Sequence, residues 1–149
     1  MSLMLHQVPD DFVPFSGSGA FCETNGPIYV RLSDATLGFR VRAEHCNPVR
    51  SCHGGWLAAF IDMQMPFAAL RSEKLRDAFL LTISLSLDYL APAKVGDWVE
   101  GSASVLRRTG SLVFAQGLVT SSGTALLRGS GVYKIARREP FTRPDQVSP

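Results

Sequence analysis

The apolar run over residues 54 to about 70 most constrains the fold of this chain. It is too long for a single strand and is rich in Ala, Leu and Met, so we expect a helix. Only Asp62 and Gln64 interrupt its apolar character, so the rest of the fold must cover it nearly all round. Pro66 cannot donate the helical hydrogen bond to the Asp62 carbonyl, so the helix either kinks beside the acid or breaks near Met65.

Apolar segments on both sides of this helix predict an antiparallel sheet. Two strands are expected before it, at 28–32 and 37–41, and four after it, at 81–89, 98–107, 112–120 and 125–136. In the first strand after the helix, five side chains alternate with polar residues and are expected on one inward face: Leu81, Ile83, Leu85, Leu87 and Tyr89. The pattern predicts an α+β fold, a bent antiparallel sheet of five to six strands wrapped around one long central helix.

Length and composition predict one globular domain over residues 1–149. Hydrophobic residues make up 46% of the chain and charged residues 19%, which excludes a disordered protein. A lead-in over 1–26 should dock by its aromatic residues Phe12, Phe15 and Phe21, and the proline-containing tail at 137–149 should be flexible.

The charge and the apolar runs limit the partners that we expect. A net charge of +2 is too small to predict a nucleic-acid partner. No apolar run approaches the roughly 18 residues that a membrane helix needs, and the first residues lack the pattern of a signal peptide. We therefore expect no membrane partner and a cytoplasmic location.

Three cysteines, Cys22, Cys46 and Cys52, are an odd and sparse set, so free thiols are expected. The neighbouring pairs His45-Cys46 and Cys52-His53 resemble a zinc ligand set. Adjacent side chains in extended backbone point to opposite faces, however, so both pairs cannot easily reach one ion. No metal is expected.

Asp62 is the residue that a purely structural account explains least well. A carboxylate on a buried helix costs several kcal/mol unless it is hydrogen-bonded, paired or protonated. A functional role is therefore favoured. The alternative is that Asp62 and Gln64 share a narrow solvent-facing stripe of the helix.

His53, Gly54 and Gly55 open the predicted helix. Glycines there would let another group approach the free N–H groups of the first turn, which favour an anion or the oxyanion formed when a carbonyl is attacked. The alternative reading is that His53 only caps or packs against the helix.

These residues stand in a specific order and spacing. They are Asn47-x5-His53-Gly54-Gly55-x6-Asp62, then Thr82, then the segment DYLAPAKVG over 88–96. Across residues 25–135 the chain resembles the hotdog acyl-CoA thioesterases of the PaaI-like, phenylacetate-pathway branch of the 4-hydroxybenzoyl-CoA thioesterase superfamily. The resemblance implies a hotdog fold and hydrolysis of an acyl-CoA to the free acid and CoA. Coenzyme A is then part of the substrate, and no cofactor is needed.

The resemblance also implies a role for each motif residue. The carboxylate matching Asp62 acts as nucleophile or as general base, and the N–H matching Gly54 polarises the thioester carbonyl. Residues matching Asn47 and His53 orient water and substrate, and the hydroxyl matching Thr82 contacts the carboxylate or its water.

In this family the acid and the oxyanion site come from different subunits, which implies a homodimer, and such dimers commonly pair into homotetramers. The spacing in this chain agrees, because Asp62 lies about 12 Å along a helix from Gly54, too far to serve the same carbonyl.

Substrate-binding candidates follow from the chemistry of coenzyme A. Its phosphates favour basic residues, and Lys94, Arg107 and Arg108 are available, as is Gly55 at the helix start. Isolated charges are more often solvated turn residues than ligands. Arg50 departs from the family, which often has glycine there, and it could contact an acidic acyl group or a phosphate, or point outward. The acyl pocket would draw on helix side chains that are otherwise ordinary core: Trp56, Phe60, Met63 and Phe67.

Two other functions stay open at this point. A hotdog dehydratase would need a histidine acting together with an acid, but the helix offers only the acid, and His6 and His45 lie outside the expected site. A non-catalytic acyl or CoA-binding module has Arg50 as its only support.

Overall fold

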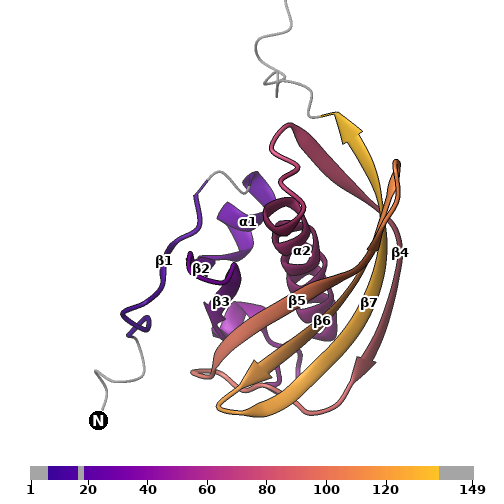
Figure 1. Ribbon diagram of the computed structural model, residues 1–149. Coiled ribbons are helices and arrows are strands. Elements are labelled where there is room, and N and C mark those ends of the chain that lie inside the picture. The colour runs from indigo at the N-terminus through magenta and orange to yellow at the C-terminus, as the bar shows by residue number, and fades with distance from the viewer. Residues whose placement is uncertain (1–6, 17–18, 138–149) are drawn as a thin grey trace, which may run out of the picture.

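The computed structural model describes residues 7–16 and 19–137 (Figure 1). Seven antiparallel strands form one sheet in the order β1-β2-β3-β5-β6-β7-β4. In chain order the elements are β1 (Val13–Pro14), α1 (Ala20–Asn25), β2 (Tyr29–Arg31), β3 (Thr36–Arg40), a 3-10 turn (Ala43–His45), α2 (Gly54–Ser72), β4 (Ala78–Tyr89), β5 (Trp98–Arg108), β6 (Leu112–Ser121) and β7 (Thr124–Arg137).

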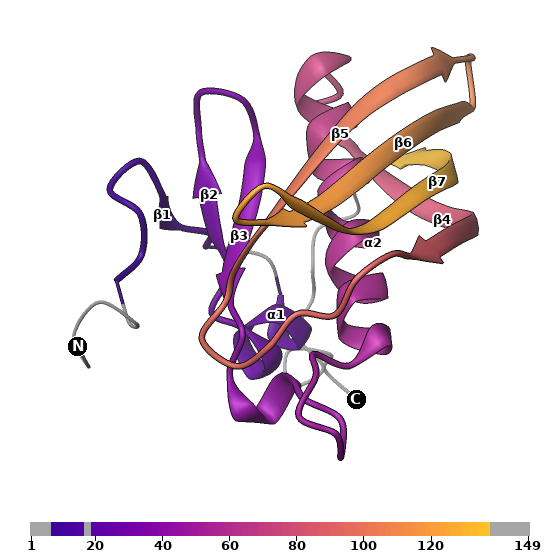
Figure 2. The same cartoon turned by 90° about the horizontal axis from the view of Figure 1, so that it is seen from below.

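The long helix α2 lies inside the curve of the sheet, with β2 and β3 on one side and β4 on the other (Figures 1 and 2). Its buried face carries large apolar side chains such as Phe60, Ile61 and Met65, all 0% exposed. Burial of this kind contributes about 1.5–3 kcal/mol per side chain, so packing rather than propensity holds the helix in place. The predicted hotdog architecture is confirmed.

Pro66 does not end the helix. The backbone stays helical as far as Ser72, so the alternative of a break near Met65 is wrong. Packing against the sheet offsets the helical hydrogen bond that Pro66 cannot donate, because α2 contacts β3, β4, β5, β6 and β7.

The sheet has seven strands instead of the five to six predicted. The additional strand is β1, a two-residue segment of the lead-in that pairs with β2 through Val13 and Val30. A strand this short has no measurable periodicity in the sequence, and its proline fits only an edge position. Lead-in aromatics dock as predicted, in the ring pairs Phe12–Trp98, Phe15–Phe67 and Phe21–Trp56.

A β-bulge corrects the prediction of one inward apolar face on β4. The register against β7 shifts just after Thr82. As a result Leu81 and Ile83 are 47% and 57% exposed, whereas Leu85 and Leu87 pack against the core. One extra residue reverses the alternation of faces, and here it turns Thr82 toward α2.

Some expectations fall on undescribed residues. The flexible tail was expected from residue 137, but β7 continues through Arg137 and the remainder, 138–149, lies outside the described part. The single domain over 1–149 therefore stays a prediction. Within the described residues, no helix combines the length and apolar character needed to cross a membrane.

Candidate active site

Asp62 lies midway along α2 and faces β4 and β7. The Thr82 hydroxyl is 2.9 Å from Oδ1 and 3.0 Å from Oδ2 of the carboxylate, and the Tyr133 hydroxyl donates to Oδ1 at 3.1 Å. The Asp62 side chain is half-buried. Among the described residues it forms no ion pair with a basic side chain. Two hydroxyl groups therefore hold the acid without neutralising its charge.

Tyr133 is the residue of this cluster that the sequence analysis missed. It lies on β7 and is 0% exposed. Burial, followed by the charge of Asp62 and the hydrogen bond to it, raises the pKa of the Tyr133 phenol far above its usual range. Tyr133 therefore stays protonated and donates its hydrogen bond throughout the physiological pH range. In the sequence, Tyr133 fits the pattern of an ordinary inward-facing strand residue.

Gln64 does not share a solvent-facing stripe with Asp62, so that alternative is wrong. Gln64 is 1% exposed. Its Oε1 accepts from the Leu37 amide at 2.7 Å and its Nε2 donates to the Ala35 carbonyl at 2.8 Å. These contacts explain its presence as a tie between the helix and the β2–β3 turn.

The start of α2 is organised by His53. Its Nδ1 accepts a hydrogen bond from the Gly55 amide at 2.8 Å, so His53 is the N-cap of the helix. A ring nitrogen that accepts an N–H bond carries no proton, so the neutral ring holds its proton on Nε2. The imidazole is exposed and can present that N–H to a bound molecule.

Gly54 carries the available amide of this helix terminus. Its N–H has no acceptor among the described residues, whereas that of Gly55 is taken by His53. The Gly54 carbonyl accepts from the Tyr89 hydroxyl at 2.7 Å, and a Cβ at position 54 would come within 3.2 Å of the Tyr89 ring. A side chain at position 54 would therefore need the Tyr89 ring to shift by a few tenths of an ångström. The free N–H lies at the positive end of the helix dipole.

The loop before the helix is built on Asn47. Its Oδ1 accepts from the amides of Val49 and Ser51, each at 3.1 Å, and only its Nδ2 is left to donate outward. Arg50 has a φ of 63°, a left-handed conformation that favours glycine. Its side chain is exposed. A glycine at this position would adopt the same conformation without a steric cost.

The basic candidates divide between the two ends of α2. Lys94 is exposed and its backbone pairs with Ser51, so it lies beside the loop at the start of the helix. Arg108 donates to the Glu73 carbonyl just after the helix ends. The 19 residues of α2 span about 28 Å, so one chain does not bring Lys94 together with Arg107 and Arg108.

Cys46 and Cys52 lie opposite each other in an isolated β-bridge, whereas His45 is buried and His53 is exposed. His45 Nε2 lies 2.6 Å from the Asn25 carbonyl oxygen, and burial lowers the pKa of this imidazole. The Cys52 thiol is also buried, which raises its pKa to about 12. Within the described residues, no group of three His, Cys, Asp or Glu side chains could hold a metal ion.

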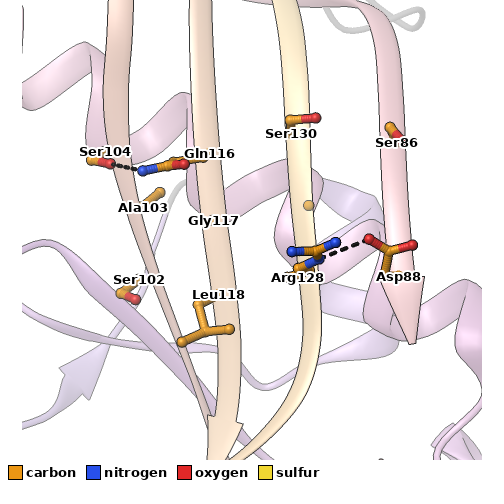
Figure 3. A pocket seen from close by; sticks show the side chains of 11 residues that line it. Ser86, Asp88, Ser102, Ala103, Ser104, Gln116, Gly117, Leu118, Arg128 and Ser130 are labelled. Atoms are coloured by element: carbon orange, nitrogen blue, oxygen red, sulfur yellow. Dashed lines mark hydrogen bonds and ion pairs between the residues drawn. The ribbon is translucent and has the colours of Figure 1, made fainter. Parts of the chain in front are cut away.

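A groove of about 550 Å³ lies on the outer face of the sheet, opposite α2 (Figure 3). Small polar side chains line it, and Arg128 crosses it to pair with Asp88 at 2.8 Å. Asp62 does not line this groove. The acid instead lies on the inner face, beside the strand that ends the sheet.

Proteins of known sequence resemble this chain over most of its length. A Pseudomonas aeruginosa protein named as an esterase is 29% identical, over 86% of this chain and 97% of its own length. Human acyl-coenzyme A thioesterase 13 is 30% identical over 92 residues, 62% of this chain and 64% of the human protein. The present chain thus covers just under two thirds of the human relative.

Solved structures share the fold. The phenylacetic acid degradation protein PaaI of Thermus thermophilus has a TM-score of 0.66 at 23% identity, covering 78% of this chain and 98% of that one. A Bacillus halodurans protein solved with CoA has a TM-score of 0.69 at 19% identity, and the match covers 79% of this chain and 77% of that one.

A family model described as the thioesterase superfamily matches residues 50–127, more than half of the 149-residue chain. The matched segment contains the start of α2, Asp62 and Thr82. The chain therefore belongs to the thioesterase superfamily, a family of thioester hydrolases, as its motif predicts.

Proposed function

We propose that this protein hydrolyses an acyl-CoA to the free acid and CoA, with Asp62 as nucleophile or as general base for water. The observation that carries the proposal is the half-buried Asp62 carboxylate, held by two hydroxyls and left without a basic partner among the described residues. A carboxylate in that setting is costly unless its charge has a use. Human acyl-coenzyme A thioesterase 13 supports the substrate class.

Gly54 supplies the second half of the chemistry. Its free N–H, with the helix dipole behind it, would stabilise the oxyanion that forms on the thioester carbonyl. His53 Nε2 and Asn47 Nδ2 are the donors left to orient water or substrate. Within one chain Asp62 is about 12 Å along the helix from Gly54, so the two cannot act on one carbonyl.

A second copy of the chain, docked along β4, would bring them together. β4 is the last strand of the sheet, is 12 residues long and exposes Phe79, Leu81 and Ile83. A long apolar edge strand favours pairing with another strand. The homodimer that we propose joins β4 to β4 antiparallel.

The position of that pairing follows from the contacts of β4. Thr82 holds Asp62 of its own chain, and Tyr89, near the other end, holds Gly54. In an antiparallel β4–β4 pair whose two-fold axis lies near Leu85 and Ser86, Thr82 would lie opposite Tyr89 of the partner subunit. Asp62 would then face Gly54 of the partner subunit, and each dimer would contain two sites.

The same axis would gather the basic residues. Arg108 contacts Glu73 near the start of β4, and this end would face the segment of the partner subunit that follows its β4 and contains Lys94. The CoA phosphates would then bind at one entrance to the site, to Arg107, Arg108 and the partner's Lys94. Arg50 is exposed near this entrance. The CoA-bound Bacillus halodurans structure of the same fold supports this use. Pairing of dimers into tetramers stays a prediction.

The proposal is tested by measuring CoA release from a panel of short, long and aromatic acyl-CoAs by the wild type and by Asp62→Asn. We expect turnover of at least one class, reduced by about 10³-fold or more in the variant. Equal turnover in both proteins would contradict the role of Asp62. Tight binding with no turnover by the wild type would favour a non-catalytic module.

Shared sites are tested by mixing subunits. Asp62→Asn and His53→Ala homodimers each lack one component of every site, but a mixed dimer has one intact site. After verified exchange, about a quarter of wild-type activity should return, since half of the dimers are mixed. No recovery would contradict sites formed across the interface.

A further inference from the structure

Tyr133 is a buried phenol whose hydroxyl has one hydrogen-bond partner among the described residues, Oδ1 of Asp62. The side chain is 0% exposed and comes from a strand 71 residues away in sequence. Phenylalanine would fill the same space without bringing a polar group into the core. Packing alone therefore does not explain the hydroxyl.

The strand makes room for this ring. Gly131 lies two residues before Tyr133 on β7, on the same face of the strand. A Cβ at Gly131 would come within 2.6 Å of both the ring and the hydroxyl of Tyr133. The absence of a side chain at 131 thus lets the ring lean along β7 until its hydroxyl reaches the acid.

Thr82 alone cannot distinguish the two carboxylate oxygens. Its hydroxyl has a single proton and lies 2.9 Å from Oδ1 and 3.0 Å from Oδ2. Tyr133, by contrast, reaches only Oδ1. Oδ1 therefore carries an additional donor, and Oδ2 keeps more of its accepting capacity.

We propose that Tyr133 is a positioning residue of the active site, which fixes Oδ1 of Asp62 and leaves Oδ2 as the reacting oxygen. Oδ2 either attacks the thioester carbonyl, so that the CoA thiolate leaves and water then cleaves the acyl anhydride, or takes the proton from the water that attacks this carbonyl and displaces the CoA thiolate. The inference rests on the proposed role of Asp62. Tyr133 acts through the carboxylate and does not touch the substrate. A carboxylate held at one oxygen cannot rotate about its χ2 bond away from the productive direction.

The test is Tyr133→Phe, assayed with the best substrate of the acyl-CoA panel. We expect kcat to fall about tenfold with KM within about twofold, since the variant loses a hydrogen bond to a charged group. The acid limb of the kcat/KM profile should move to higher pH, because the lost donor favoured the charged carboxylate. Tyr29→Phe is the matched control: this ring packs on Trp98, away from Asp62, and should leave kcat and the profile unchanged.

A merely structural Tyr133 would give a different result. A wild-type kcat, or a lower kcat with an unmoved pH profile, would overturn the proposal. A double-mutant cycle in urea unfolding checks the contact itself: Tyr133→Phe should cost less stability in the Asp62→Asn background than in the wild type. If Tyr133→Phe does not fold, Gly131→Ala, which displaces the ring but keeps the hydroxyl, should give the same loss of kcat and shift of profile, and an unchanged profile overturns the proposal.

Asp62→Asn and Tyr133→Phe separate the proposed function from the positioning role of Tyr133. If Asp62→Asn retains full turnover, the proposed function is wrong whatever Tyr133 does. If Asp62→Asn is inactive while Tyr133→Phe is indistinguishable from Tyr29→Phe, only the positioning role is wrong.

Discussion

Two polar side chains, Asp62 and Gln64, interrupt the apolar surface of α2, and they differ in what surrounds them. They are two residues apart and so project about 200° from one another around the helix. Gln64 faces the β2–β3 turn and β5, where fixed backbone groups use both ends of its amide. Asp62 faces β4 and β7, where its hydrogen-bond partners among residues 7–16 and 19–137 are two side-chain hydroxyls.

The surroundings of these two side chains distinguish a structural polar group from a functional one. The amide of Gln64 is buried, carries no charge and has hydrogen-bond partners within the chain, so its contacts contribute to the stability of the fold alone. Asp62 is charged, half-buried and lies next to an unpaired sheet edge. A group of this second kind stabilises the fold little but keeps its reactivity.

Gln64→Leu should have the largest effect on stability. It leaves the Leu37 amide and the Ala35 carbonyl without partners in the core, so the free energy of unfolding should fall by about 3 kcal/mol. Turnover per folded molecule should stay at the wild-type value. Urea unfolding and kcat of the folded fraction measure the two effects. Asp62→Asn is the opposite case, with turnover lost and stability kept, and equal destabilisation by both variants would erase the distinction.

Thr82→Ala tests the hydroxyl contacts on the Asp62 face of α2. It removes the donor that spans both carboxylate oxygens, and kcat should fall about tenfold, equivalent to about 1.4 kcal/mol. Thr82→Ser keeps the hydroxyl and should stay within about twofold of the wild type. Loss of activity in Thr82→Ser as large as in Thr82→Ala would show that the methyl group, not the hydroxyl, matters. Steady-state kinetics on one substrate decides between these outcomes.

A matched pair of glycines probes the two faces with the same chemical change. A Cβ at Gly101 would come within 3.0 Å of Gln64, and one at Gly131 within 2.6 Å of Tyr133. Each alanine should destabilise the fold by about 1 kcal/mol through crowding. Only Gly131→Ala should also lower kcat, because only that crowding reaches the acid. If Gly101→Ala lowers kcat equally, the two faces are mechanically coupled.

The residues that could be predicted from the sequence are those with a local pattern. The helix over 54–70 and the strands after it follow from periodicity, whereas the contact of Asp62 with Thr82 was implied by the resemblance of the motif to a known family. Gly54 was identified as the candidate oxyanion donor for the same reason. Its free N–H is a property of the first turn of any helix.

Features set by tertiary contact could not be predicted. Tyr133 alternates like the other core residues of its strand, and nothing local shows that it meets an acid 71 residues away. The bulge after Thr82 is a single extra residue that no feature of the local sequence indicates. It leaves Leu81 and Ile83 exposed, contrary to the prediction. The alternative of a solvent-facing stripe with Gln64 stayed open because the backbone groups that bond its amide, at Ala35 and Leu37, are distant in sequence.

The alkaline limit of stability gives the smallest predicted difference between the two faces. Burial and the charge of Asp62 raise the pKa of Tyr133 in the folded state, so the stability that this shift contributes is complete below the unfolded value of about 10 and is lost as pH rises above it. At pH 10.5 the wild type should have lost about 0.8 kcal/mol from this group alone. The difference in free energy of unfolding between wild type and Tyr133→Phe, measured in urea, should therefore shrink by that amount between pH 8 and 10.5.

Cys52, whose pKa is also raised, titrates in both proteins, so its contribution cancels from this difference. Gln64→Leu removes no titrating group, so its stability should run parallel to that of the wild type over the same range. A constant offset for Tyr133→Phe would mean that neither burial nor the charge of Asp62 raises the pKa of this phenol, and the contrast between the Asp62 face and the Gln64 face of α2 would fail at this contact.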